Sequence, residues 1–328
     1  MSTTVSIQNT TDWARTYPGL TAALGNPVAG YAGTNVPLRI ANKVLQNILQ
    51  QPFAFKWNRR APQPFYLNGL QQDYSTSITD LGWLENCIRI QVNNPMYPPP
   101  APPCYITRGV ETDRELLPTS AQGTIENLCW VPNSEAIAGS WIAKAVYTPP
   151  SPLLNLAVQP LTQIWDSNGN LQVLTTFGTC GSTPPTWNTV ANQTTTDGTS
   201  VWTMADPNGI TFRVSPLPPE SGINYLIQPY YQKKPATLAT MNTMWPVPDE
   251  FSSLYEEGFL AWAWDAAGES KKSLEKMQLF MVLRKQMTAS QDREAESFSM
   301  SPGRSLTGVS GSLTKGDMQN PPGLFSGY

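Results

Sequence analysis

The sequence predicts an α+β fold: a helical bundle, made of an N-terminal helix and a C-terminal helical hairpin, with a large antiparallel β-rich domain inserted and extended arms at both ends. Three observations support this fold class. Apolar residues recur at helical spacing in residues 37–49 and 245–296. Strand-forming residues and Gly or Pro turns fill the region between them. Both ends of the chain are polar and interrupted by Gly and Pro.

The composition supports this mixture of helices, strands and loops. Charged residues make up 14% of the 328-residue chain, which contains 31 Pro and 23 Gly, and this favours short strands and loops over an all-helical fold. The predicted boundaries are an N-terminal arm at residues 1–36, a helical domain at 37–63 and 236–297, a β-rich inserted domain at 64–235, and an extended C-terminal tail at 298–328.

The first helix is predicted to begin at Pro37, because proline is favoured in the first helical turn, and to end before Pro52. Its apolar stripe comprises Ala41, Val44, Leu45, Ile48 and Leu49. Alternating aromatic residues at positions 53, 55 and 57 then predict a strand that carries them inward. Arg59 and Arg60 follow, and this pair either binds carboxylates of a neighbouring chain or forms a solvated basic end.

Further strands are predicted at residues 71–78, 84–92, 124–131 and 140–147, where β-branched and aromatic residues partly alternate. Two Asp-x-Asn-Gly sequences also stand between β-rich runs. Their Asn168-Gly169 and Asn208-Gly209 pairs predict β-hairpins with type I′ turns, because Asn and Gly tolerate positive φ. A calcium loop is disfavoured, since Leu171 occupies the position where such a loop needs glycine.

Residues 94–103, NPMYPPPAPP, predict a stiff polyproline-type connector. Proline has no backbone N–H, so this segment cannot donate hydrogen bonds to a sheet. It could serve as a ligand for a proline-binding module, or simply as a rigid surface loop. We interpret it as a surface loop.

Residues 245–296 predict a helical hairpin that needs packing partners on more than one side. Asp249 follows Pro248 and is expected to cap the first helix, which ends near Ala267 before Gly268. The second helix is apolar nearly all round in residues 277–283, so one face cannot bury all of it. Its surplus apolar surface is expected to pack on the first helix of the chain or on another subunit.

The residue types argue against catalysis and metal binding. The chain contains no histidine, which removes the commonest general base and a common metal ligand. No nucleophile elbow, phosphate loop or dinucleotide motif follows a strand. No C-x-x-C pair occurs among the cysteines, which are Cys87, Cys104, Cys129 and Cys180. The carboxylates of the β-rich region are interpreted as surface residues rather than a glycosidase pair; they include Asp73, Glu85, Asp113 and Glu115. We therefore expect no enzymatic activity and no cofactor.

The charge and the ends of the chain bound its partners. A net charge of −3 gives no basic stripe for binding the phosphate backbone of nucleic acid. The N-terminus lacks the basic start and apolar stretch of a signal peptide, and no apolar run is long enough to cross a membrane. We expect a protein that is made and kept in the cytosol and has no membrane partner.

A Tyr-Gln-x-x-Pro segment, with Tyr231, Gln232 and Pro235, precedes the Pro248-Asp249 pair that opens the helical hairpin. In these residues above all, the chain resembles head-to-tail adaptor (connector) proteins of tailed bacteriophages. The resemblance implies a virion protein that forms a ring, usually twelvefold, in the neck. Such a ring docks under the portal protein and receives tail or neck proteins, and DNA passes through its lumen as cargo.

The resemblance and the surplus apolar surface predict assembly contacts. The tail at 298–328 has too few apolar residues to fold alone, and we expect another surface to hold it. The predicted interface residues are Phe280, Met281, Val282, Leu283, Leu306, Leu313, Leu324, Phe325, Arg59 and Arg60. Two alternatives remain open: a receptor- or glycan-binding tail-fibre or decoration protein, and a hydrolase that works without histidine.

Overall fold

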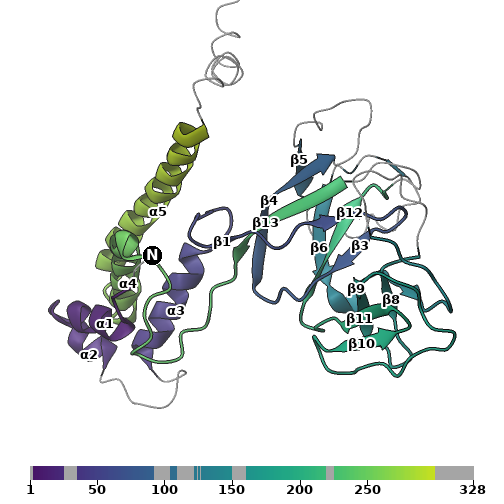
Figure 1. Ribbon diagram of the computed structural model, residues 1–328. Helices are drawn as coiled ribbons and strands as arrows, with labels where there is room; N and C mark the ends of the chain where they lie inside the picture. The colour runs from purple at the N-terminus through teal and green to yellow at the C-terminus, as the bar shows by residue number, and fades with distance from the viewer. Residues whose placement is uncertain are drawn as a thin grey trace, which may run out of the picture. The chain divides into compact units, whose positions relative to one another are not determined.

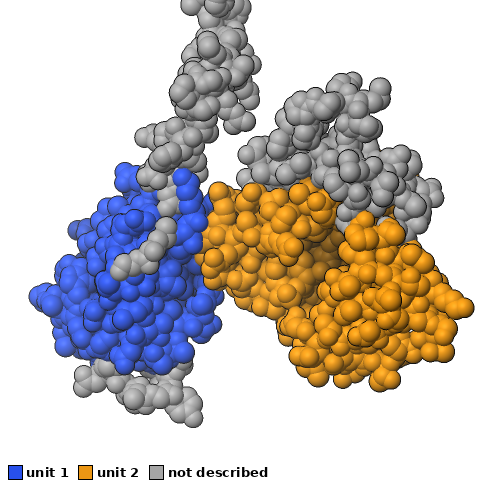
Figure 2. Space-filling model, viewed as in Figure 1, with its two compact units in different colours: residues 1–57, 235–328 blue, residues 58–234 orange. Residues whose placement is uncertain are grey.

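The computed structural model describes residues 3–25, 35–91, 104–108, 122–123, 125, 127–149, 160–218 and 225–299 (Figure 1). The chain divides into two compact units, one of residues 1–57 with 235–328 and one of residues 58–234 (Figure 2). Within the described residues, the α-helices belong to the first unit and the β-strands to the second.

Two helices of the first unit, α1 and α3, begin with local capping residues. The Ser6 side chain accepts a hydrogen bond from Asn9 N at the start of α1, and the Asn35 side chain accepts one from Leu38 N at the start of α3. Gly268, at a positive φ of 79°, separates α4 from α5. The helices are α1 (Ile7–Arg15), α2 (Leu20–Leu24), α3 (Val36–Ile48), α4 (Ser252–Ala266) and α5 (Ser270–Ser299), and a 3-10 turn, η3 (Asp249–Phe251), precedes α4.

Helix α4 lies at the centre of this unit, with contacts to α1, α2, α3 and α5. Its close approach to two neighbours depends on Gly258. A Cβ atom built there would lie 2.9 Å from Val44 Cγ1 of α3 and 3.0 Å from Phe280 Cδ2 of α5. Both neighbouring side chains are fully buried. Glycine therefore allows α3 and α5 to pack against the same turn of α4.

The aromatic residues after α3 pack inward, as predicted, but they form no strand. Phe55 is fully buried, and its ring centroid lies 6.1 Å from that of Phe251 in an edge-on contact. The alternation at positions 53, 55 and 57 thus reflects insertion into a helical core, where contacts from distant residues determine the backbone path.

The predicted capping role of Asp249 is wrong. Its carboxylate accepts hydrogen bonds from Thr4 N at 3.0 and 3.1 Å and from Thr4 Oγ1 at 2.8 Å, and no side chain caps α4. The Thr4 backbone N–H, followed by its hydroxyl, lowers the pKa of Asp249. The contact fixes the N-terminal segment next to α4, and Trp245 N bonds Val5 O beside it.

The second unit contains two sheets. The strands are β1 (Arg59–Arg60), β2 (Phe65–Tyr66), β3 (Asp73–Ser75), β4 (Leu81–Gln91), β5 (Cys104–Arg108), β6 (Asn127–Pro132), β7 (Gly139–Ser140), β8 (Gln163–Trp165), β9 (Leu171–Thr176), β10 (Thr194–Asp197), β11 (Ser200–Met204), β12 (Ile210–Ser215) and β13 (Tyr225–Lys233). An eight-stranded sheet has the order β1-β13-β4-β5-β6-β12-β3, with β2 paired to β13. A five-stranded sheet has the order β10-β11-β9-β8-β7.

Long-range pairing defines these sheets. Strand β13 pairs with β4 along nine residues, although the two strands are far apart along the chain. Strand β12 lies between β6 and β3. The pairs β5–β6 and β7–β8 are parallel, and the other strand pairs are antiparallel, within the residues that the structure describes. Each sheet therefore mixes both kinds of pairing.

Of the two predicted hairpins, one is confirmed and one is wrong. Strands β8 and β9 form an antiparallel hairpin around Asp166–Asn170. Its turn is not type I′, because Gly169 has a positive φ and Asn168 does not. The Asp166 carboxylate shapes this turn by accepting from Asn168 N and Asn170 N.

The second Asn-Gly turn joins strands of different sheets. Strand β11 belongs to the five-stranded sheet and β12 to the eight-stranded sheet, so no hairpin forms. Gly209 has an ordinary φ here, but a Cβ atom at this position would lie 2.5 Å from Thr76 O. Glycine is needed for this close backbone approach rather than for turn type.

The strand predicted at residues 140–147 is also wrong. Only its first residue lies in β7, and Lys144 has a positive φ of 55°. The remainder bonds to residues 178–181, including Lys144 N to Gly181 O at 2.9 Å. This segment is a loop that packs beside the five-stranded sheet.

The predicted fold class is wrong. We expected a helical bundle with one inserted antiparallel β domain; the described residues instead form a β-rich chain, with thirteen strands in two sheets of mixed pairing and five α-helices. The N-terminal arm predicted at residues 1–36 contains α1 and α2, whose residues Ile7 and Leu20 are fully buried. Hydrogen bonds to Met241 and Thr243 hold the start of α1, and no local sequence pattern indicates these contacts.

The close packing at Gly258 predicts a steric effect. Replacing Gly258 with Val should lower the unfolding free energy by about 1–3 kcal/mol, because the added atoms overlap Val44 and Phe280. The matched change Ala289→Val, at an exposed position of α5, should cost only about 0.5 kcal/mol. Denaturant unfolding of both variants measures the difference, and equal stability of the two would contradict the packing argument.

The contact between Asp249 and Thr4 predicts a pH effect. Because the pKa of Asp249 is lowered in the folded protein, its stabilising effect should be complete above the ordinary Asp pKa of ~3.9. The effect should then vanish as the pH falls through the folded pKa. The stability difference between the wild type and Asp249→Asn should follow this course in unfolding curves measured from pH 7 downward. Asp265→Asn, an exposed carboxylate change on α4, serves as the control, and a pH-independent difference for Asp249→Asn would contradict the assignment.

Candidate functional site

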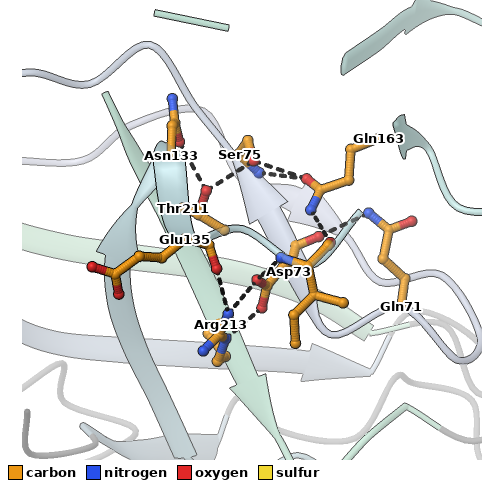
Figure 3. A network of polar contacts seen from close by, with 9 residues as sticks. Gln71, Asp73, Ser75, Asn133, Glu135, Gln163, Thr211 and Arg213 are labelled. Atoms are coloured by element: carbon orange, nitrogen blue, oxygen red, sulfur yellow. Dashed lines mark hydrogen bonds and ion pairs between the residues drawn. The ribbon is translucent and has the colours of Figure 1, made fainter. Parts of the chain in front are cut away.

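A buried ion pair lies in the eight-stranded sheet. Asp73 of β3 stands directly opposite Arg213 of β12, and the guanidinium binds the carboxylate through Nε–Oδ1 and Nη2–Oδ2 contacts of 2.7 Å each (Figure 3). Asp73 is fully buried and Arg213 is 6% exposed. Arg213 Nη2 also donates to Glu135 O at 3.1 Å, and the hydrogen bonds that Arg213 donates to Asp73 raise the pKa of Arg213.

Two glutamines connect this ion pair to the five-stranded sheet. Gln163 of β8 accepts hydrogen bonds from Ser75 N and Oγ, at 3.0 and 2.9 Å, and donates to Ile137 O at 2.6 Å. Gln71 accepts from Thr162 N and Oγ1 at 2.9 Å and donates to Asp73 O. Asp73 Oδ2 itself accepts from Ile137 N at 2.7 Å. We call the set of Gln71, Asp73, Ser75, Gln163 and Arg213 the inter-sheet network.

The chemistry of the inter-sheet network is structural. Its carboxylate is saturated by a bidentate arginine and a backbone N–H, and it is closed to solvent. A general acid or base needs access to substrate, which this carboxylate lacks. The network instead satisfies buried polar groups that would otherwise destabilise the contact between the sheets.

The prediction that the carboxylates of this region lie on the surface is wrong for Asp73. It is also wrong for Glu85, which has an 11% exposed side chain and binds Arg59. Asp113 and Glu115 lie outside the described residues. The pairings depend on strand register, which brings together residues that are 140 and 26 positions apart. Alternation within one strand gives no sign of such a partner.

A small pocket opens beside the network, between the Asp166–Asn170 turn, the Asp206–Gly209 turn and the 3-10 turn η2 (Asn133–Glu135). Its volume is about 230 Å³. Its lining comprises Asn133, Ser134, Trp165, Gly169, Asn170, Leu171, Met204, Ala205 and Pro207. We call it the Trp165 pocket.

Asn133 links the Trp165 pocket to the network behind it. Its side chain donates to Thr76 O and Asp206 O, at 3.0 and 2.7 Å, and accepts from Thr211 Oγ1 at 2.8 Å. Thr211 Oγ1 in turn bonds Ser75 Oγ at 2.8 Å (Figure 3). These bonds fix the wall of the pocket to β12 and to the residues that follow β3 and β11.

The predicted interface segment of α5 divides into a buried and an exposed part. Phe280 is fully buried against α4, and Leu283 is partly buried on the same core. Met281 and Val282 are 44% and 48% exposed. Leu274 is 60% exposed and lies seven residues before Met281, so both stand on the same side of the helix. We call Leu274, Met281 and Val282 the α5 apolar face.

The two predicted arginines have different surroundings. Arg59 Nε donates to Glu85 Oε2 at 2.8 Å and its Nη2 contacts Oε1, so its carboxylate partner comes from its own chain. Gln232 Nε2 donates to the same Glu85 Oε2 at 2.7 Å. Arg60 is exposed on β1. The predicted interface residues of the C-terminal tail, Leu306, Leu313, Leu324 and Phe325, lie outside the described residues.

Among the described residues of the first unit, Arg284 is a buried cation that was not predicted from the sequence. Arg284 of α5 is 5% exposed, its guanidinium lies 3.8 Å from the Phe53 ring centroid, and it contacts Asn47 O near the end of α3. Burial lowers the pKa of Arg284. A cation at a helix C-terminus interacts favourably with the helix dipole, so Arg284 stabilises the C-terminal end of α3. Its position one helical turn from Phe280 was the available signal.

No group of three potential metal ligands occurs among the described residues. No helix in the described part of the chain is both long and apolar enough to cross a membrane.

A family model described as SU10 adaptor protein matches residues 143–306, which are 164 of the 328 residues, or half of the chain. The matched region runs from the loop after β7 through β8 to β13 and both long helices α4 and α5. Searches of curated proteins and of solved structures found no match.

The buried ion pair predicts a large stability effect. Replacing Asp73 with Ala leaves Arg213 charged, buried and without its carboxylate, which should lower the unfolding free energy by about 3–5 kcal/mol. The same change at the exposed Asp265 should cost less than about 0.5 kcal/mol. Urea unfolding monitored by tryptophan fluorescence compares the two variants. A loss below about 1 kcal/mol for Asp73→Ala would show that water replaces the carboxylate at low cost.

Proposed function

The chain belongs to the SU10 adaptor protein family, and on that premise we propose that it is a head-to-tail adaptor which assembles into a ring between the portal and the tail of a tailed bacteriophage. The family match points to a phage structural protein of the virion rather than an enzyme. This agrees with the resemblance of the sequence to adaptor proteins of tailed bacteriophages. The ring, its position in the neck and its partners form the proposal.

The family match over residues 143–306 is the observation that carries this proposal. It spans the whole of α4 and α5, and therefore includes the α5 apolar face. Soluble proteins seldom leave several large apolar side chains together on one exposed face unless a partner covers them. A neighbouring copy of the chain is the partner that a closed ring supplies.

The proposed partners are further copies of the chain, in a ring that we expect to be twelvefold, together with the portal protein and tail or neck proteins. DNA passes through the lumen as cargo. A net charge of −3 suits a wall that does not bind the phosphate backbone tightly, because strong attraction would hinder passage. The C-terminal tail beyond residue 297 is proposed to reach the portal or an adjacent subunit.

Measurement of the assembled mass tests the proposal. Native mass spectrometry and negative-stain electron microscopy of the chain, alone and with portal protein, should detect a closed ring. Met281→Glu with Val282→Glu should abolish this species while thermal unfolding of the subunit changes by less than about 1 kcal/mol, because both residues are exposed. Gln286→Glu, which adds one negative charge at an exposed polar position of α5, should still assemble.

Removal of residues 298–328 supplies a second arm of this experiment. The truncated subunit should remain folded and soluble but should no longer join the portal. The adaptor proposal would be rejected by normal portal attachment of both altered proteins, or by a subunit that stays monomeric in the presence of portal. Loss of folding in the Met281 and Val282 variant would instead assign that face to the core of the subunit.

A further inference from the structure

The Trp165 pocket has chemistry that the inter-sheet network does not use. None of its nine lining residues carries an ionisable side chain. Leu171, Met204 and Ala205 give it a buried apolar floor, and the half-buried Trp165 packs beside them. Its volume of about 230 Å³ is below the ~300–1,000 Å³ typical of sites for drug-sized ligands. The pocket therefore fits one or two side chains of a partner better than a cofactor.

Free polar groups stand around this apolar floor. Within the described part of the chain, the Asn170 amide and the Ser134 hydroxyl make no side-chain hydrogen bond, whereas the adjacent Asp166 and Asn133 are fully engaged. An amide and a hydroxyl can both donate to a carbonyl oxygen. The pocket thus offers an apolar surface, an aromatic side chain and neutral donors in one place.

These are the features that bind polyproline segments. Such a segment presents apolar rings and a row of unpaired carbonyl oxygens, and it loses little conformational entropy on binding because it is already extended. Aromatic-lined grooves with hydrogen-bond donors recognise it. The chain's most proline-rich uncharged segment is of this kind: NPMYPPPAPP at residues 94–103, with six prolines.

We propose that the Trp165 pocket of one subunit binds the proline-rich segment at residues 94–103 of a second copy. A segment without charge matches a pocket without charge, since neither has to lose ionic hydration on binding. The proposal rests on the proposed function in one respect: assembly brings copies of the chain together at high local concentration.

Strand register shows why the segment must come from a second copy. The segment joins β4 to β5, so both of its ends are fixed at one end of the eight-stranded sheet. In the parallel pair β5–β6, Thr107 stands level with Asn127; Cys104 lies three residues before that level, and Asn133 lies six residues beyond it. Cys104, where the proline-rich segment ends, and Asn133, at the pocket, are therefore nine residues apart along the strand direction. At ~3.3 Å per residue this is about 30 Å. Half of the twelve residues 92–103 can extend only ~20 Å at ~3.5 Å per residue, so the segment cannot reach the pocket of its own copy.

Peptide titration tests the proposal. A synthetic NPMYPPPAPP peptide should bind the full chain in isothermal titration calorimetry, and the same peptide with every proline replaced by alanine should bind at least tenfold more weakly. Asn170→Ala with Ser134→Ala should also weaken binding about tenfold, because two donors are lost. Thr183→Ala, at an exposed position outside the pocket lining, should bind like the wild type.

Three results would overturn the proposal. They are no detectable binding of the peptide at millimolar concentration, equal binding of the alanine peptide, and binding that the Asn170 and Ser134 changes leave intact. Glucose and N-acetylglucosamine are titrated in parallel as the other class of neutral ligand. Sugar binding that these two changes abolish, in the absence of peptide binding, would assign the pocket to a carbohydrate instead.

The outcome is separable from that of the adaptor proposal. If rings form but the peptide does not bind, the pocket assignment fails and the adaptor proposal stands. If the peptide binds and no ring forms with portal protein, the adaptor proposal fails and the pocket assignment stands.

Discussion

The bidentate contact between Asp73 and Arg213 is the interaction on which the second unit depends. Burial of either charge alone would be strongly unfavourable, so the pair requires β3 and β12 to meet in one register. Asp73 also accepts from Ile137 N, and Gln71 and Gln163 extend the same network to the five-stranded sheet. The two sheets are therefore joined by directional polar bonds, which specify one arrangement more narrowly than apolar packing does. The Trp165 pocket is held by the same polar bonds, because Asn133 lines the pocket and is connected through Thr211 to Ser75 of the inter-sheet network.

The first unit follows a different physical rule, in which close packing replaces polar specificity. Gly258 lets α3 and α5 approach one turn of α4, and Trp245 stacks on Tyr255 with ring centroids 4.7 Å apart. The polar contacts lie mainly at the edges, where Asp249 holds Thr4 and Arg284 closes α3. Such contacts secure chain ends and helix ends on a core that apolar burial stabilises.

Local sequence patterns correctly predicted the helices and turns that depend on interactions between residues close together in the chain. The stripe from Ala41 to Leu49 predicted α3 because one buried helical face requires that spacing. The Asp166–Asn170 turn was predicted from its own residues, because an Asn-Gly pair between two β-rich runs favours a chain reversal. The fold class, the partner of Asp249 and the Asn208-Gly209 connection were wrong because each depends on segments distant in sequence. The same limit hid the candidate site: Asp73 and Arg213 are 140 residues apart, and only strand register makes them neighbours. Turn residues show where a chain reverses, but not which strand it joins next.

The apolar run in α5 illustrates how one sequence feature can carry two roles. A helix that is apolar all round has to bury more than one face, and the structure assigns its faces separately. Phe280 completes the core through its contact with α4, whereas Met281 and Val282, the next two residues, point away from that core and remain exposed. Because neighbouring helical positions differ by about 100° in direction, Met281 and Val282 are turned by about 100° and about 200° from Phe280 and leave the core that Phe280 joins. The exposed side chains therefore contribute little to the stability of the subunit, and burial against another chain is the role that would use them.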